Sequence, residues 1–174
     1  MPKRLIAPLV NGRVRLRLIE EADLPMTLAW RNRDDIRPWF LTTDVISADQ
    51  HRGWYEQYAD RDDDFVFIIE ETEAFRRPVG QISIYAIDWK AGHEKFGRLM
   101  IGDLAARRLG LARLATSRLV DEVCHAWHLR EVFLESRVDN SPALAVYETC
   151  GFRAVGYVTE DVMIMRRDAP SGRS

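Results

Sequence analysis

Strands are predicted wherever a short apolar run alternates with polar residues or stands between turn residues. Val14, Leu16 and Leu18 alternate with arginines at positions 13, 15 and 17, the period of two that a strand with one buried face requires. Further apolar runs, bounded by polar turns, predict strands at residues 65–69, 79–87, 96–101 and 132–134, and a closing hairpin at 152–158 and 162–166.

Four helices are predicted from apolar residues at the helical period and from capping residues. The longest follows Gly110, where apolar side chains recur at positions 111, 114, 115, 119, 123 and 126, close to a period of about 3.6. Acidic residues at 20–23 favour a helix start through the helix dipole. Ser47 and Gln50 form a capping box, and Ser141 with its following proline suits a first helical turn that ends near Gly151.

The elements follow the order β-α-α-β-β-β-α-β-α-β-β, which predicts a mixed α/β (α+β) fold. The 174 residues suit one domain with a sizeable core. We expect that single domain to cover residues 1–167. The remaining residues, 168–174, are rich in Pro, Gly and Ser and are predicted to form a disordered tail.

Composition and charge argue against several classes of function for this chain. A formal net charge of −2 lacks the basic excess of proteins that bind nucleic acid. No apolar run reaches the length of a membrane span, and the first ten residues fit neither a signal nor a transit peptide. We therefore expect a cytoplasmic protein without nucleic-acid or membrane partners. Cys124 and Cys150 are expected to be buried thiols, and the nearby His125 and His128 complete no metal shell.

A glycine turn at the start of the longest predicted helix carries the first chemical signal. Residues 107–112 read Arg-Arg-Leu-Gly-Leu-Ala. Such a turn leaves backbone N–H groups free, and the helix dipole adds partial positive charge, which suits a pyrophosphate. Taken alone, the turn is equally compatible with a structural glycine and solvated arginines. Asn140, Tyr147 and the pair Gly151-Phe152 follow downstream at a consistent spacing.

Together these residues resemble the acetyl-CoA site of the GNAT superfamily of N-acetyltransferases, over nearly the whole chain from Val14 to Arg166. The resemblance implies a GNAT fold: a mostly antiparallel mixed sheet of about seven strands splayed into a V, with helices on both faces. It also implies acetyl-CoA as the co-substrate, no metal, and direct transfer of the acetyl group to the primary amine of a small-molecule acceptor. A homodimer is the expected assembly.

The resemblance assigns the donor-binding residues. Backbone groups of the strand at 96–101 would pair with pantetheine as an added strand does and would stabilise the oxyanion of the reacting carbonyl. N–H groups of the glycine turn would hold the pyrophosphate, with arginines adding charge-assisted bonds. Asn140 would bond the pantetheine arm, cap the following helix, or do both. The implied residues are Leu99, Met100, Ile101, Arg107, Leu109, Gly110, Leu111, Ala112, Arg113, Asn140 and Tyr147.

Tyr147 and Glu135 are the catalytic residues that the resemblance implies. Tyr147 lies two helical turns after Asn140 and would protonate the departing thiolate; the alternative is an ordinary packed tyrosine. Glu135 would act as the base or order a base water, unless it is only a solvent-facing charge. Glu94 is a second candidate for the base. It is displaced by one residue from the position that some relatives use, where Lys95 stands, and so belongs to the opposite strand face.

A series of cationic, amide and aromatic residues in the N-terminal half bears on the acceptor. Arg31 and Asn32 follow Trp30, and His51 precedes Trp54 by three positions. This series resembles the PseH-like branch, which acetylates nucleotide-linked amino sugars, more than it resembles generic members. By that resemblance Arg31, Asn32, His51 and Trp54 would bind the acceptor, its diphosphate by charge and its base or sugar by stacking on an indole.

Three alternatives remain open from the sequence. The same residues can be structural, with Arg31 and Asn32 bonded to carbonyls and Trp54 packed on its helix. The acceptor can be a peptide N-terminus, as for the RimJ/RimL-like enzymes that acetylate ribosomal proteins. The chain can also be a non-catalytic module that binds acyl-CoA and regulates a partner, although it retains both Tyr147 and Glu135.

Overall fold

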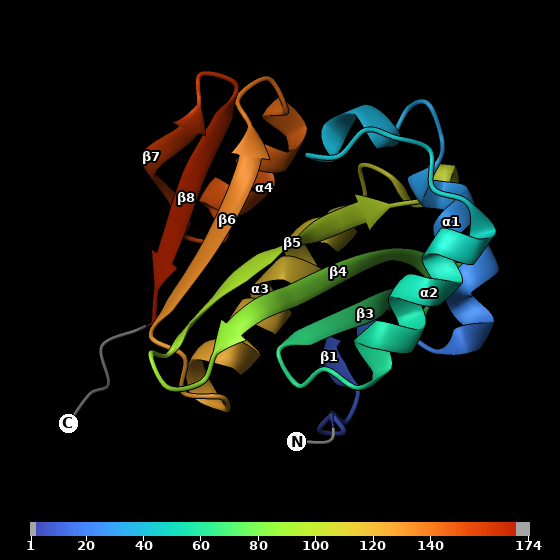
Figure 1. Ribbon diagram of the computed structural model, residues 1–174, viewed down its shortest axis with the longest axis horizontal. Coiled ribbons are helices and arrows are strands. Elements are labelled where there is room, and N and C mark those ends of the chain that lie inside the picture. The colour runs from blue at the N-terminus through green and yellow to red at the C-terminus, as the bar shows by residue number, and fades with distance from the viewer. Residues whose placement is uncertain (1–2, 170–174) are drawn as a thin grey trace.

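One eight-stranded sheet forms the centre of the protein, seen here in a computed structural model that describes residues 3–169 (Figure 1). Its order is β1-β2-β3-β4-β5-β6-β8-β7, and all neighbours are antiparallel except β5 and β6, which are parallel. The predicted mixed, mostly antiparallel sheet is confirmed. The strands are β1 (Leu9–Asn11), β2 (Val14–Leu18), β3 (Asp64–Glu71), β4 (Arg77–Asp88), β5 (His93–Ile101), β6 (Glu131–Arg137), β7 (Arg153–Thr159) and β8 (Val162–Asp168).

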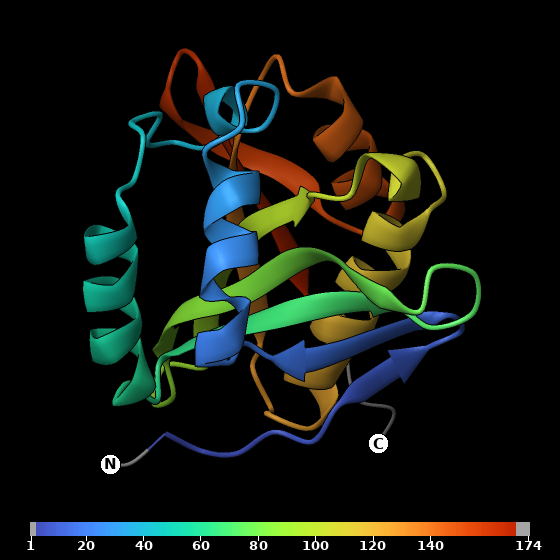
Figure 2. The same cartoon turned by 90° about the vertical axis from the view of Figure 1, so that its right-hand side faces the viewer.

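Helices cover both faces of the sheet, as predicted. The helices α1 (Leu24–Arg31) and α2 (Ala48–Ala59) lie on one side, and α3 (Leu111–His125) and α4 (Ser141–Thr149) lie on the other (Figure 2). Short 3-10 turns stand in the connections: η1 (Glu21–Asp23), η2 (Arg37–Trp39) and η3 (Leu104–Ala106). The capping box predicted for α2 is present, since the Ser47 side chain accepts a hydrogen bond from the Gln50 N–H and the Gln50 side chain accepts one from the Ser47 N–H.

The two ends of the chain differ from the prediction. β1 is not predicted, because its three residues are too few to show a period; it pairs with β2 across Gly12, whose φ of +55° suits a tight turn. At the other end, β8 includes Asp168, whose carboxylate binds Arg153 and Arg166. Asp168 therefore belongs to β8 and not to the predicted tail, and the Ala169 N–H donates to the Arg130 carbonyl at 2.8 Å. Residues 170–174 lie outside the described residues.

The main core lies between the sheet and α3. Alternate residues of the central strands, such as Phe65 and Phe96, are fully buried together with Leu119 of α3. β3 is buried on its other face as well, because Val66 and Ile68 pack into a second cluster beneath α1 and α2. This burial on both faces explains the unbroken apolar run in β3. Both cysteines are buried free thiols, as expected.

β5 and β6 separate soon after they meet. They pair only through residues 93–95 and 131–133 and then diverge, which opens the sheet into the predicted V (Figure 1). β5 also carries one residue more than β4 between Gly97 and Met100, a β-bulge in which Arg98 has a φ of +51°. Because a bulge bends its strand and increases the local twist, it helps to turn the rest of β5 away from β6.

Glu94 lies at the vertex of the V, opposite Val132 of β6. Its side chain is buried near Cys124 of α3, and neither carboxylate oxygen has a hydrogen-bond partner within residues 3–169. Burial raises the pKa of Glu94 to about 8, because the core solvates a charge poorly. The carboxyl group is therefore mostly protonated at neutral pH, and it lies on the face opposite to Lys95, as the one-residue displacement predicts.

Glu94→Gln is expected to remove a pH dependence of the free energy of unfolding. The pKa rises from 4.5 to about 8 on folding, so the stability that depends on the protonated carboxyl is complete below pH 4.5 and is lost as the pH approaches 8. Each pKa unit corresponds to about 1.4 kcal/mol. Urea denaturation at a series of pH values measures the loss in the wild type relative to Glu94→Gln.

Glu131→Gln is the matched control, because Glu131 stands at the same vertex but is half-buried and paired with Arg166. This variant should keep the pH dependence of the wild type. Parallel curves for Glu94→Gln and the wild type would show that Glu94 ionises as freely in the folded protein as in the unfolded chain.

Candidate active site

A cavity of about 470 Å³, the donor cavity, lies beside the end of β5 and the start of α3. On the β5 side it reaches backbone groups that do not pair with β6, since the two strands have diverged. On the α3 side it reaches the first turn of the helix. The predicted donor-binding residues that line it are Leu99, Met100, Ile101, Arg107, Gly110, Leu111, Ala112, Arg113 and Asn140.

The turn before α3 has the conformation that an anion cradle needs. Gly110 directly precedes the helix with a φ of +76°, and Arg108 is also left-handed with a φ of +59°. The first N–H groups of a helix have no carbonyl partner within it, and the positive end of the dipole lies there. A Cβ on Gly110 would meet nothing within 4 Å. Glycine is therefore favoured here by the left-handed backbone conformation and not by steric crowding. These features fit the pyrophosphate of acetyl-CoA.

Leu109 does not line the donor cavity. Its side chain is 41% exposed, and its carbonyl accepts a hydrogen bond of 2.7 Å from Nη2 of Arg13. Arg13 precedes β2 and was not among the predicted site residues. It holds the glycine turn from outside, so Leu109 contributes to the shape of the turn through its backbone.

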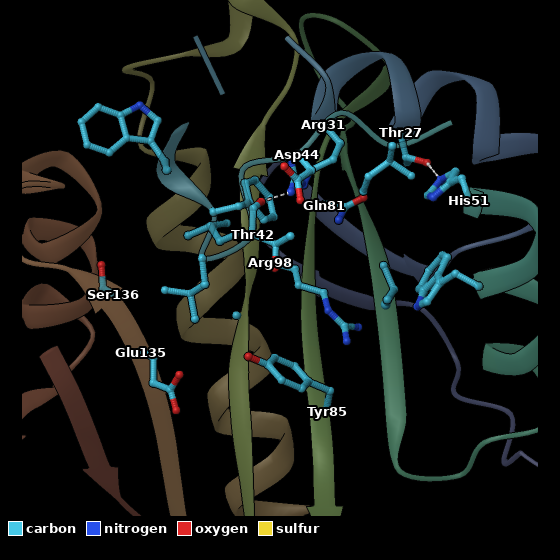
Figure 3. Close-up of a pocket in the computed structure, with 18 of the residues that line it drawn as sticks. Thr27, Arg31, Thr42, Asp44, His51, Gln81, Tyr85, Arg98, Glu135 and Ser136 are labelled. Carbon is cyan, nitrogen blue, oxygen red and sulfur yellow. Dashed lines mark hydrogen bonds between the residues drawn. The ribbon is translucent and has the colours of Figure 1, made fainter. Parts of the chain in front are cut away.

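A second cavity, of about 610 Å³, lies between the arms of the V and beneath α1 and α2 (Figure 3). We call it the acceptor cavity. Four residues line both cavities: Trp39, Phe40, Leu99 and Asn140. The two cavities therefore adjoin, which direct transfer between two bound substrates requires. The predicted catalytic and acceptor-binding residues that line the acceptor cavity are Arg31, His51, Trp54, Glu135 and Tyr147.

Asn32 is the predicted acceptor residue that the structure places elsewhere. Its side-chain amide donates to the Ile46 carbonyl at 2.7 Å and accepts from the Ile46 N–H at 2.9 Å. Both ends of the amide are therefore occupied by one backbone position. Asn32 ties the segment that follows α1 to the start of α2 and is absent from the cavity wall among residues 3–169.

Glu135 enters the acceptor cavity from β6 and is held by Lys95 of β5. Lys95 Nζ donates to Glu135 Oε1 at 2.6 Å, an ion pair that bridges the two arms close to the vertex. Tyr85 of β4 directs its hydroxyl toward Glu135 from the opposite arm (Figure 3). Lys95 bonds Oε1, so Oε2 is the oxygen that can face an amine or an ordered water. The position suits the predicted base.

Tyr147 lies at the junction of α4 with the core. It is 8% exposed and packs edge-on against Phe96 and Phe152, with ring centroids 5.9 and 6.1 Å apart. Burial raises the pKa of the Tyr147 phenol, so the hydroxyl stays protonated at neutral pH. Asn140, two turns earlier, caps α4 by accepting from the Ala143 N–H. Asn140 therefore caps α4 and also lines both cavities.

Arg31 is a buried cation in the acceptor cavity. Its guanidinium is stacked 4.3 Å from the ring centroid of Phe40 and donates through Nη2 to the Thr42 carbonyl. Nη1 is buried and has no partner in the described part of the chain. Burial, and then the charge of Arg37, lowers the pKa of Arg31. The residue thus brings an incompletely compensated positive charge to the cavity wall.

His51 and Trp54 form part of an aromatic stack on α2. The indole of Trp54 is stacked on His51 at 5.3 Å and on Tyr58 at 5.1 Å, and these neighbours stand on successive turns of the helix. Both indole faces are therefore covered, so Trp54 presents an edge to the cavity and has no face free for a base or sugar. His51 Nε2 lies 3.1 Å from Thr27 Oγ1 (Figure 3), and burial lowers the pKa of His51.

Several lining residues were not predicted from the sequence. Trp39 and Phe40 come from the irregular segment between α1 and α2, where their large apolar side chains were a signal that could have been used. Tyr85 and Arg98 come from β4 and β5, on the face that α3 does not cover. Lys95 reaches Glu135 only because β5 and β6 are neighbours, which no local pattern reveals.

Residues 3–169 contain neither a candidate metal site nor a candidate membrane span. No three His, Cys, Asp or Glu side chains gather into a group that could hold a metal ion. No helix in this range combines the length and the apolar character needed to cross a membrane.

Residues 13–153 match the model of a family described as an acetyltransferase (GNAT) domain. The chain belongs to this family. The predicted superfamily is confirmed, and with it the predicted class of enzyme, an N-acetyltransferase that uses acetyl-CoA. The finer likeness to the PseH-like and RimJ/RimL-like branches of the GNAT family is not decided by this match and stays a prediction.

Relatives of this GNAT chain resemble it over most of its length. A spermidine N(1)-acetyltransferase of Vibrio cholerae is 22% identical over 158 residues, 91% of this chain and 89% of the relative. A crystal structure of the Vibrio cholerae spermidine N-acetyltransferase with CoA and spermine has a TM-score of 0.83 at 23% identity, covering 91% and 97% of the two chains. A dodecameric structure of that enzyme has a TM-score of 0.75 at 22% identity, covering 91% and 95%. These likenesses confirm the fold.

Gly110→Ala is expected to weaken the binding of acetyl-CoA, because a left-handed conformation costs a residue with a Cβ about 1–2 kcal/mol and the turn would shift. Gly53→Ala is the matched control, since Gly53 lies within α2 with nothing within 4 Å of an added Cβ; alanine there should stabilise the helix by about 1 kcal/mol. Titration calorimetry and thermal unfolding measure both effects. Equal affinities for acetyl-CoA in the wild type and both variants would show that the conformation of Gly110 does not matter for acetyl-CoA binding.

Proposed function

We propose that this enzyme acetylates the primary amine of a small acceptor that also carries an anionic group, as nucleotide-linked amino sugars do. The observation that carries the proposal is the buried guanidinium of Arg31, with Nη1 unpartnered within residues 3–169. A buried charge without a counter-ion is costly. A phosphate or carboxylate of the acceptor would supply the missing partner, because such groups match the donors of a guanidinium.

The charges around the acceptor cavity favour such an acceptor over a polycation. The lining residues include two arginines, Arg31 and Arg98, and two carboxylates, Asp44 and Glu135. Glu135 is paired with Lys95, and Arg98 is paired with the buried carboxylate of Asp64. One charge of each sign in this set, on Arg31 and on Asp44, then remains without an ion pair among residues 3–169. A wall with as many cations as anions has no excess of negative charge with which to concentrate a polyamine. An acceptor with one ammonium group and a distant anion matches the wall better.

The proposed transfer uses backbone groups that line the donor cavity together with Glu135, Tyr147 and His51, which line the acceptor cavity. Backbone N–H groups at residues 99–101 would stabilise the negative charge that develops on the acetyl oxygen. Glu135, or a water that it orders, would take a proton from the amine. Tyr147 would donate its hydroxyl proton toward the departing sulfur, because burial keeps the phenol protonated. His51 would contact the acceptor as a neutral imidazole, since burial lowers its pKa.

A polyamine is the second candidate acceptor. The relatives from Vibrio cholerae are spermidine acetyltransferases, and one of their structures contains spermine. In this chain Asp44 and Glu135 are the carboxylates that would bind the ammonium groups. This candidate predicts that Arg31 has no role in acceptor binding, which separates it from the first.

Self-association belongs to the proposal as well. The homodimer expected from the sequence stays a prediction, and the dodecameric structure of a relative raises the possibility of a larger assembly here. Sedimentation velocity on the purified protein, with and without acetyl-CoA, distinguishes a monomer, a homodimer and a dodecamer by their sedimentation coefficients.

The acceptor is tested by release of CoA thiol in the presence of three panels: amino-sugar nucleotides, polyamines, and peptides with free N-termini. We expect turnover with the first panel. Arg31→Gln should raise the KM for those acceptors by about tenfold or more, since hydrogen bonds to charged groups contribute about 1.5–3 kcal/mol. It should change the KM for acetyl-CoA much less, because Arg31 lines the acceptor cavity and is connected to the segment that lines both cavities through the Thr42 carbonyl and the Phe40 ring. Arg52→Gln, which removes an exposed cation of α2, is the control.

Other results on the same panels would point elsewhere. Turnover of polyamines alone, with equal KM values in the wild type and Arg31→Gln, would replace the first candidate by the second. Turnover of peptides alone would place the chain with the enzymes that acetylate protein N-termini. Binding of acetyl-CoA without turnover of any panel would favour a regulatory acyl-CoA-binding module.

Tyr147→Phe is expected to lower kcat by about 100-fold, the size of effect typical for loss of a general acid, with little change in the affinity for acetyl-CoA. The phenyl ring keeps the packing against Phe96 and Phe152, so the folded structure should survive. Tyr157→Phe is the control, because Tyr157 is exposed on β7. Steady-state kinetics with unchanged kcat in Tyr147→Phe would remove this hydroxyl from the mechanism.

A further inference from the structure

Residues 33–46, which we call the bridging segment, form part of both cavities. Trp39 and Phe40 line both, Asp35 lines the donor cavity, and Thr42 and Asp44 line the acceptor cavity. Figure 1 shows this segment at the open end of the V, between α1 and α4. A displacement of this segment would therefore affect the binding of both substrates.

The bridging segment is fixed to the rest of the protein at its two ends. On the acceptor side, the side chains of Arg31 and Asn32 bond the backbone of Thr42 and Ile46. On the donor side, Arg33 donates to the Gly102 carbonyl just after β5. Arg33 also binds both carboxylate oxygens of Asp35, at 2.9 and 2.8 Å. The carboxylate of Asp35 is thus oriented from within its own segment.

Asp35 in turn holds Arg107, the first residue of the glycine turn. Arg107 Nη1 lies 2.7 Å from Asp35 Oδ2, and Arg107 Nε donates to the Ile101 carbonyl at 3.1 Å. The third nitrogen, Nη2, makes no hydrogen bond with the described residues. Arg107 lines the donor cavity, so a guanidinium fixed at two nitrogens has its third available to a ligand.

We propose that Asp35 is a positioning residue for the donor: it orients Arg107 toward the pyrophosphate of acetyl-CoA and so ties the bridging segment to the occupied donor site. The inference rests on the proposed acetyl transfer and on the prediction from the sequence that Arg107 and the glycine turn hold that pyrophosphate. Fixing a long side chain before the ligand binds reduces the entropy lost on binding. Asp35 itself needs no contact with the donor.

The opposite role, in which Asp35 competes with the phosphates for Arg107, is disfavoured by the charges. Arg33 and Arg107 together supply two positive charges to the single carboxylate of Asp35. The cluster keeps a net positive charge, which attracts a phosphate. Because Asp35 contacts Nη1, a phosphate can bind Nη2 without breaking the existing ion pair.

Asp35→Asn tests the inference through two ligands, acetyl-CoA and S-acetylpantetheine, which has the thioester but no pyrophosphate. We expect the Kd for acetyl-CoA to rise by about threefold to fivefold, the range of a partly exposed ion pair, and the Kd for S-acetylpantetheine to stay constant. Asp34→Asn is the matched control, because Asp34 is the preceding carboxylate and pairs with Arg37 inside the bridging segment. It should leave both Kd values unchanged.

Arg107→Gln completes a double-mutant cycle. Since Asp35 acts through Arg107, the change Asp35→Asn should have no further effect on acetyl-CoA binding in the Arg107→Gln protein. Tighter binding of acetyl-CoA by Asp35→Asn, or equal loss of both ligands, would overturn the inference. An Arg107→Gln protein that binds acetyl-CoA as tightly as the wild type would also overturn the inference. The proposed function would still stand in that case if the wild type acetylates the expected acceptors. A wild-type protein that does not bind acetyl-CoA would refute both.

Discussion

The site depends on the separation of β5 and β6 after three residue pairs. In a continuous sheet, the backbone N–H groups of residues 99–101 that do not pair with β4 would bond to a strand on the other side, as buried backbone groups must. Divergence leaves them available to a substrate, and the bulge at Arg98 bends β5 at that point. The same three pairs also direct the side chains of the vertex, since Glu94 enters the core and Lys95 crosses to Glu135. One local departure from regular pairing thus creates the donor edge and places the proposed base.

Ion pairs hold the walls of the two cavities in place. Arg33, Asp35 and Arg107 form a chain of alternating charge from the bridging segment to the glycine turn, and Lys95 joins Glu135 across the V. Each pair is partly exposed and contributes little to the free energy of unfolding. Their importance is geometric, because a side chain fixed by one partner presents its remaining polar atoms in a defined direction. Arg31 differs from all of them, since it is buried and lacks a carboxylate partner within residues 3–169.

The donor half could be predicted from the sequence because it is built from local features. A glycine before a helix, an amide at a helix start and a tyrosine two turns later are each visible within a few residues. The acceptor half depends on distant segments, as Lys95 and Glu135 show by meeting from 40 positions apart. Residue type was also misleading there: Asn32 bonds the backbone of Ile46, and both faces of Trp54 are covered. Strand β1 was too short to show any period.

The difference between the donor half and the acceptor half also limits what similarity to a relative can say about the acceptor of this enzyme. The proposed donor contacts come largely from backbone N–H groups, which every sequence with this fold possesses, whereas the proposed acceptor contacts come from side chains, several of them on α1, α2 and the bridging segment. At 22% identity a relative can share the backbone cradle while most side chains differ. The acceptor must therefore be inferred from this cavity's own charges. A polycation beside Arg31 would add like-charge repulsion to a desolvation cost that the Thr42 carbonyl and the Phe40 ring offset only in part, whereas an anion would be attracted to the guanidinium.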